Sequence, residues 1–217
     1  RFRDQGEAIC LWADLLILES KFQDAQGLYQ RARDIGEAHG LFSLESHACL
    51  GLGNLATREG RDAEGLDLLR NAFAAGRITE HENSIVEELD SLPSLLDALF
   101  KADELEEVAP LLPRFREAAK ADSQRRGRVC CEELRSHYYF ARLHEARGKP
   151  QQAAREMCAL LDRLLENQRV VHDATPREIR KLLQDASDCL KILDPELGEE
   201  DLVQLVKSLV DDLDHLS

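Results

Sequence analysis

The sequence is poor in aromatic residues, and strand-favouring Val, Ile and Thr are sparse. Only 5% of its 217 residues are aromatic, while Leu, Ala, Glu and Arg predominate. Since the abundant residues are those of long helices, the composition excludes a predominantly β fold. Apolar residues still make up 43%, close to the globular norm, so the chain can form a sizeable core. We therefore predict an all-α protein.

The sequence also lacks long apolar runs, a signal-peptide pattern and any regular cysteine spacing. No apolar stretch approaches the roughly 20 residues of a membrane-spanning helix, so we expect no membrane insertion. The chain begins at Arg1 without methionine, and we expect either a removed leader or a piece of a longer protein. Its six scattered cysteines predict free thiols in a reducing, intracellular compartment. The cytoplasm fits this expectation best, and an organelle stays open.

Basic residues are in short supply. The chain has 42 acidic against 28 basic side chains and a formal net charge of −14. Such a chain repels phosphate backbones and anionic membrane surfaces, which excludes nucleic acid as a partner over most of its surface. A protein with a basic stretch is the electrostatically favoured partner. The alternative is that the charge only keeps the domain soluble.

Recognisable catalytic and metal-binding motifs are missing. There is no P-loop, nucleophile elbow, kinase signature, HExxH or CxxC. His137 and His144 are seven residues apart, which does not suit a metal pair on a helix, and we expect both in a packing seam. For the adjacent Cys130 and Cys131 we expect one buried and one partly exposed thiol. The sequence thus predicts no enzyme and no catalytic, cofactor or metal site.

What the sequence does contain is a repeated pattern. An apolar-periodic helix is followed by a short polar break and by a second helix with a small residue early in it. Four segments show it, at residues 8–35, 47–73, 91–115 and 136–161. Small residues at Ala13, Gly53 and Ala141 in the first helix of three units would let the next helix approach closely.

The residues at these repeated packing positions resemble the motif of the tetratricopeptide repeat family over about residues 6–172. Trp12-Ala13 and Leu52-Gly53 stand where the motif has Leu-Gly, and Ala25 and Gly65 stand at the small residue of the second helix. The anchors Ala25, Gly65, Val108 and Ala153 lie 40, 43 and 45 residues apart, against about 34 in the standard motif. The resemblance is therefore to the long-repeat variety, as in kinesin light chains. HEAT or armadillo packing is the nearest alternative.

The resemblance implies a right-handed α-α superhelix, a solenoid of four helix pairs. We place the repeat array at residues 1–172. Its units lie at about 6–39, 43–77, 80–120 and 127–172. Two further amphipathic helices in 173–217 are expected to cap the last unit, or else to dock a partner or a second copy.

Single positions lead to further expectations. Gly40, Gly60, Gly76 and Gly148 are predicted to end helices as caps. The sole tryptophan, Trp12, is expected in the core rather than anchoring a ligand.

Prolines and arginines suggest local irregularities in the second half of the array. Pro93 predicts a break near Ser91 that separates residues 80–90, and prolines 110 and 113 predict a kink in the helix from Glu104. The basic stretch 123–128 is taken as a solvated turn, or else as a site for phosphate or an acidic peptide.

By the phase of the repeat, side chains of each first helix that packing does not use would line a concave groove. The resemblance implies that a peptide or helix of another protein binds there. The candidate groove residues are Asp14, His47, Asn54, Arg58, Asp97, Lys101, Arg135, Tyr138 and Arg142. Asn54, Arg58 and Lys101 partly match the carboxylate clamp with which some family members hold chaperone tails, but Asp14 would repel a carboxylate.

We therefore interpret the chain as a scaffold or adaptor for protein–protein interaction and as a subunit of a larger assembly. The alternative is a non-catalytic repeat arm of a larger enzyme or regulator, with the active domain outside these residues. A weaker hypothesis is self-association through the last two helices.

Overall fold

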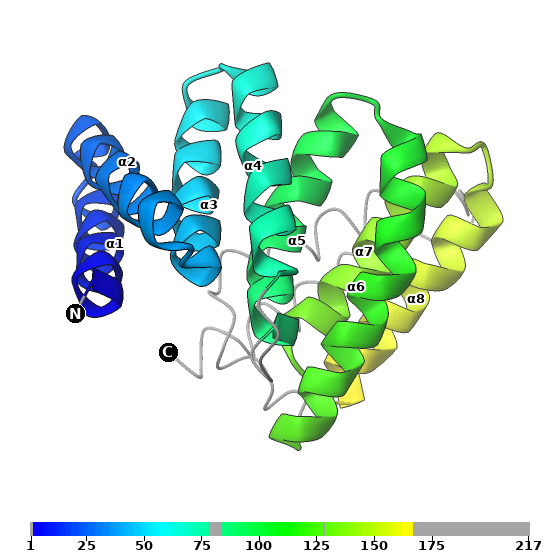
Figure 1. The fold of residues 1–217 in the computed structure, drawn as a ribbon. Helices are drawn as coiled ribbons and strands as arrows, with labels where there is room; N and C mark the ends of the chain where they lie inside the picture. Colours follow the sequence, from blue (N-terminus) through cyan, green and yellow to red (C-terminus); the bar gives the residue numbers. More distant parts are fainter. Residues whose placement is uncertain (1, 79–83, 128, 167–217) are drawn as a thin grey trace. The chain divides into compact units, whose positions relative to one another are not determined.

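The computed structural model describes residues 2–78, 84–127 and 129–166. This part of the chain contains eight α-helices and no strand, which confirms the all-α prediction (Figure 1). The helices are α1 (Phe2–Leu18), α2 (Phe22–His39), α3 (Phe42–Arg58), α4 (Asp62–Gly76), α5 (Ser84–Lys101), α6 (Leu105–Arg126), α7 (Cys131–Ala146) and α8 (Pro150–Glu166). The predicted capping helices of 173–217 lie outside the described residues.

The chain forms two compact units, Arg1–Val108 and a second that begins at Ala109 within α6. In the first unit, each of α1 to α4 packs on the next helix in sequence. In addition, α1 contacts α3 and α3 contacts α5. These three helices therefore form one layer of the unit, and α2 and α4 cover it from the other side. The predicted boundaries of four repeat units stay a prediction.

Small residues allow the close helix packing of the first unit. Ala13 and Ala25 are fully buried between α1 and α2. A Cβ atom on Gly53 would lie 2.8 Å from the Leu69 side chain, and one on Gly65 would lie 2.4 Å from Thr57 Oγ1 of α3. Since real Cβ atoms essentially never come so close, both glycines are needed for the contact between α3 and α4.

Glycines also end three of the helices. Gly40, Gly60 and Gly148 adopt left-handed φ angles of 64°, 79° and 66° just after α2, α3 and α7. This confirms their predicted role, because only glycine adopts this conformation without steric cost. Gly76 differs, since it is the last helical residue of α4 and the next residue, Arg77, is still right-handed.

The predicted break near Ser91 is wrong, because α5 continues from Ser84 to Lys101 with Pro93 inside it. A proline inside a helix costs about 3 kcal/mol. Burial of a leucine contributes about 1.5–3 kcal/mol. Burial of five leucines around Pro93 stabilises the helix by more than the proline costs. They are Leu89, Leu92, Leu95, Leu96 and Leu99. Helix α6 likewise contains Pro110 and Pro113, and the kink predicted there stays a prediction.

Two predictions about burial are also wrong. Trp12 is exposed rather than part of the core, and Cys130 and Cys131 are both buried. Trp12 occupies a packing position of α1, but no neighbouring helix covers it within the described structure. Cys130 precedes α7, its backbone amide donates to Ser123 Oγ at 2.9 Å and its thiol lies 3.4 Å from the Ala119 carbonyl oxygen, so Cys130 packs against α6. The five described cysteines carry free thiols.

Candidate functional site

Three polar side chains occupy the same repeat position in the first unit. Asp14 on α1, Asn54 on α3 and Asp97 on α5 each follow directly after the packing pair of their helix. Asp14 is half-exposed, and Asn54 and Asp97 are exposed. Because α1, α3 and α5 form one layer, these residues make a row of hydrogen-bonding groups along it, which we call the polar row.

The first member of the polar row is held by its neighbours. The Tyr29 hydroxyl donates to Asp14 Oδ1 at 2.5 Å, and His47 Nε2 lies 3.2 Å from Asp14 Oδ2. Burial and then this hydrogen bond raise the pKa of Tyr29 well above its usual range, so it stays a donor. The candidate residues Asp14 and His47 are thus brought together, with the carboxylate oriented and still open to solvent.

Two cations of the predicted groove already have partners within the first unit. The Arg58 guanidinium lies 3.9 Å from the centre of the Phe22 ring, and Lys101 Nζ is 2.6 Å from Asp62 Oδ1. Phe22 and Asp62 are the first residues of α2 and α4, so the two contacts are equivalent. In each, a cation in the last turn of one helix contacts the start of the preceding one. Each of the two cations is therefore in contact with the preceding helix.

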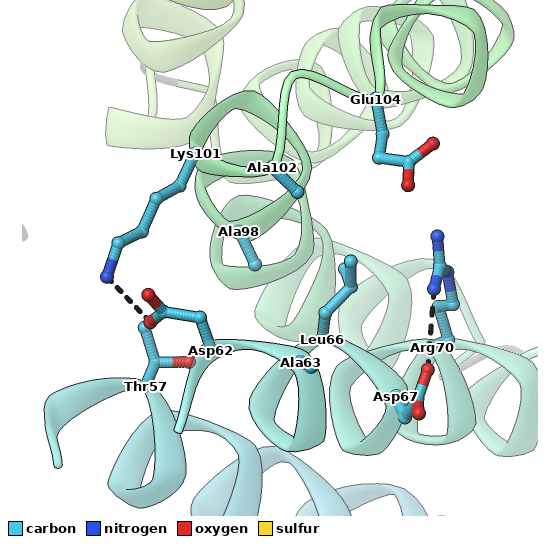
Figure 2. Close-up of a pocket in the computed structure, with 10 residues that line it drawn as sticks. All are labelled: Thr57, Asp62, Ala63, Leu66, Asp67, Arg70, Ala98, Lys101, Ala102 and Glu104. Atoms are coloured by element: carbon cyan, nitrogen blue, oxygen red, sulfur yellow. Dashed lines mark hydrogen bonds and ion pairs between the residues drawn. The ribbon is translucent and has the colours of Figure 1, made fainter. Parts of the chain in front are cut away.

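A hollow of about 330 Å³ lies beside Lys101, between α4 and the end of α5 (Figure 2). Leu66, Ala98 and Ala102 give it an apolar floor. Its rim carries the Lys101–Asp62 ion pair on one side and Arg70 on the other. Arg70 binds Glu107 Oε1 at 2.5 Å and Asp67 Oδ1 at 3.4 Å, while Glu104 lies opposite it in Figure 2. The hollow suits one apolar side chain flanked by basic groups, because acids outnumber bases on the rim.

The remaining candidates lie on α7 in the second unit. Arg142 has the polar-row position of its own helix, and its guanidinium carbon is 5.6 Å from the centre of the Tyr138 ring. Arg135 and Tyr138 are half-buried. The structure thus brings Tyr138 and Arg142 together but adds no acidic residue of the polar-row kind, so we confine the candidate site to the first unit.

Sequence reasoning missed an ion-pair network in the second unit. Glu156 on α8 accepts hydrogen bonds from Arg116 Nη2 at 2.6 Å and Nη1 at 3.2 Å, and it lies 2.7 Å from His137 Nδ1. Burial alone would raise the pKa of Glu156, but the hydrogen bonds from His137 and Arg116 outweigh it and lower the pKa to about 2. No spacing in the sequence links these residues, which come from three helices.

The basic stretch 123–128, expected as a turn, is helical as far as Arg126, the last residue of α6, and the alternative of an anion site stays a prediction. Arg125 and Arg126 bind the two carboxylate oxygens of the buried Asp122 at 2.7 and 2.6 Å. Within the described residues no three metal-ligating side chains come together. No helix of that part combines the length and apolar character that crossing a membrane requires.

Solved structures with the same arrangement of helices identify the fold. No family model matches the sequence, and no curated protein does. The BtubC (BKLC) protein of P. vanneervenii aligns with a TM-score of 0.71 at 15% identity, over 96% of this chain and 80% of its own. A variant of a putative kinesin light chain with nearly identical TPR-like repeats from Podosopora anserina aligns with a TM-score of 0.69 at 14% identity, over 99% of both chains. The chain has the tetratricopeptide-type repeat fold.

A third structure with this fold concerns peptide binding. YrrB, described as a TPR protein with an unusual peptide-binding site, aligns with a TM-score of 0.57 at 15% identity, over 96% of this chain and 92% of its own. Identities this low establish the tetratricopeptide-type fold and not the ligand.

Proposed function

We propose that the chain is a protein-interaction scaffold, a subunit of a larger assembly, that holds a segment of a partner protein along the polar row of its first unit. The row of Asp14, Asn54 and Asp97 at one repeat position is the observation that carries this proposal. Side chains that recur at the spacing of the helices can hydrogen-bond an extended peptide or a helix laid across them.

Charge indicates the chemistry of that segment. Two of the three residues in the row are acidic, the nearby hollow has an acidic rim, and the chain has a net charge of −14. A segment with lysine or arginine opposite the row, and an apolar side chain in the hollow, would complement both features. A segment ending in a free carboxylate would meet Asp14 unfavourably.

Identification of the partner is the first experiment. Proteins that co-purify with the chain from its native source would be identified by mass. Overlapping peptides of each would then be titrated calorimetrically against the purified chain. The proposal expects a binding peptide with basic residues and an affinity that falls as salt is added.

A matched pair of double variants then locates the site. Asn54→Lys with Asp97→Lys should weaken binding of that peptide at least tenfold, because it places cations opposite cations. Gln30→Lys with Asp34→Lys makes the same change in charge at exposed positions of α2, and binding should stay within about twofold. Equal weakening by both pairs would show that only the overall charge matters and would overturn the proposed site.

A further inference from the structure

The hollow between α4 and the end of α5 differs from the equivalent place one repeat earlier, between α2 and α3. At three of the positions that line the hollow, the side chain is smaller or more polar than its repeat equivalent. By the anchor spacings of 40 and 43 residues, the earlier and later residues of each pair are Ile17 and Thr57, Phe22 and Asp62, and Leu55 and Ala98.

The chain's own side chains fill the earlier place. Leu55 is 3% exposed and belongs to the core cluster of the first unit, and Ile17 and Phe22 pack against that cluster. Between α4 and α5 the helices pair in the same way, but a hollow of about 330 Å³ is left. It results from the smaller residues and not from a missing helix, because helices of the first unit form its walls.

Basic groups on two walls suit an aromatic ring. Lys101 and Arg70 lie on opposite sides of the hollow above its apolar floor (Figure 2). Cations of both kinds stack on the faces of aromatic rings. One repeat earlier, Arg58 has the position of Lys101 and its guanidinium lies over the Phe22 ring. The space that lacks a ring of its own therefore keeps the cation that accompanies one.

The charges of the rim determine what can flank that ring. Three acids, Asp62, Asp67 and Glu104, line the hollow together with the two bases Lys101 and Arg70. The rim therefore has a surplus of negative charge. A partner residue beside the ring meets a favourable potential if it is lysine or arginine and an unfavourable one if it is acidic.

We propose that this hollow is the anchor pocket for one aromatic side chain of a partner protein, with lysine or arginine beside the aromatic residue. The ring takes the space that Leu55 and Phe22 fill one repeat earlier and lies between Lys101 and Arg70. The inference rests on the proposed function in that the ring belongs to the partner segment held by the polar row. Its test changes no residue of that row, so either proposal can fail without the other.

The methyl groups of the floor provide a direct assay. The probe is the blocked tripeptide acetyl-Lys-Phe-Lys-amide, titrated into the full chain with its alanine and leucine methyl groups labelled for NMR. The methyl signals of Leu66, Ala98 and Ala102 should shift, because the bound ring lies over them. Replacing the phenylalanine of the probe by alanine should weaken binding about tenfold, since the apolar contact is lost. Replacing both lysines by glutamate should also weaken it.

Filling the hollow then tests whether it is the site. Ala98→Leu gives α5 the residue that α3 has at the equivalent position, and it should weaken binding of the probe about tenfold. Ala102→Leu fills the hollow from an exposed position, where a larger side chain costs little in stability, and should have the same effect. Ala38→Leu, at an exposed position of α2 outside the lining, is the control and should leave binding unchanged.

Four results would overturn this proposal. The first is equal affinity for the phenylalanine and alanine probes, and the second is unchanged binding in both filling variants. The third is contact, in the free monomer, between the floor methyl groups and another part of the same chain, which would mean that the hollow is already filled. The fourth is a doubled mass in light scattering with floor signals that depend on protein concentration, which would identify a second copy as the occupant.

The outcome for the polar row is read separately. If the probe binds as expected but Asn54→Lys with Asp97→Lys leaves the partner peptide unaffected, the polar row fails and the pocket stands. If that double variant weakens the partner peptide but the probe does not shift the floor signals, the pocket fails and the polar row stands.

Discussion

The two units each pair a histidine with a carboxylate from another helix, but in different surroundings. In the first unit His47 and Asp14 are 3.2 Å apart, and their side chains are 43% and 42% exposed. In the second unit His137 and Glu156 are 2.7 Å apart and only 14% and 18% exposed. Arg116 adds a bidentate hydrogen bond to the Glu156 carboxylate. The same kind of pair is therefore a solvent-accessible polar group in one unit and part of the packing in the other.

This contrast bears on where a ligand can bind. Exposed ion pairs contribute about 0–1 kcal/mol, since water competes for both groups, whereas removing one member of a buried pair is costly. The Asp14 carboxylate can exchange its contacts for those of a ligand at little cost in stability. Glu156 cannot, because Arg116 and His137 would be left without an acceptor. The four predictions that follow test this difference.

The largest expected effect comes from Glu156→Ala. It should lower the free energy of unfolding by about 3 kcal/mol, because the donors of Arg116 and His137 lose their common acceptor. Asp14→Ala, the matched change in the first unit, should cost about 1 kcal/mol, mainly through the Tyr29 hydroxyl. Urea unfolding followed by circular dichroism measures both. Equal losses would refute the contrast between the two pairs.

The second prediction concerns acid. The pKa of Glu156 is about 2 in the folded chain and 4.5 ordinarily. Protons therefore bind the unfolded chain more strongly, and the stabilisation by ionised Glu156 is fully present above about pH 4.5 and lost as the pH falls towards 2. The melting temperature of the parent should exceed that of Glu156→Gln at pH 6, and the gap should narrow between pH 4.5 and 2.5. A gap that stays constant over this range would contradict the role assigned to Glu156.

Arg116→Lys should have an intermediate effect of about 1–2 kcal/mol. Lysine keeps the charge but loses the two-pronged contact with Glu156 and the stacking of the guanidinium 3.7 Å over the Phe140 ring. Arg58→Lys, which loses an exposed stack over Phe22 in the first unit, should cost about 0.5 kcal/mol. Thermal and urea unfolding would compare them, and a larger loss at Arg58 would reverse the predicted order.

The smallest effect is expected for His47→Gln. Because the pair with Asp14 is exposed, stability should change by less than about 0.5 kcal/mol. His137→Gln, with the donor in the buried network, should cost clearly more, about 1 kcal/mol. Both are measured by urea unfolding at pH 6. A loss at His47 as large as at His137 would mean that the first pair is also a packing element.

Much of the fold could be predicted because repeats make the same local demands several times. Ala13, Gly53 and Ala141 are buried where close packing was predicted, and Gly40, Gly60 and Gly148 end helices with left-handed φ angles. These properties depend on residue type and spacing, which the chain displays directly.

Other features could not be predicted because they depend on which side chains of a neighbouring helix pack against a residue. The repeat pattern puts Trp12 at a packing position, but a side chain at such a position is buried only when another helix packs against it. Pro93 carries a helix-breaking cost that buried leucines outweigh only in the folded unit.

By itself the sequence determined helices, their turns, the repeat of small residues and the position of the polar row, because each follows from local periodicity and steric size. Only the tertiary structure decided that Glu156 meets Arg116 and His137, that Arg58 and Lys101 contact the preceding helices, and that Trp12 is exposed. Those facts depend on distances between helices, and no spacing along one helix contains them.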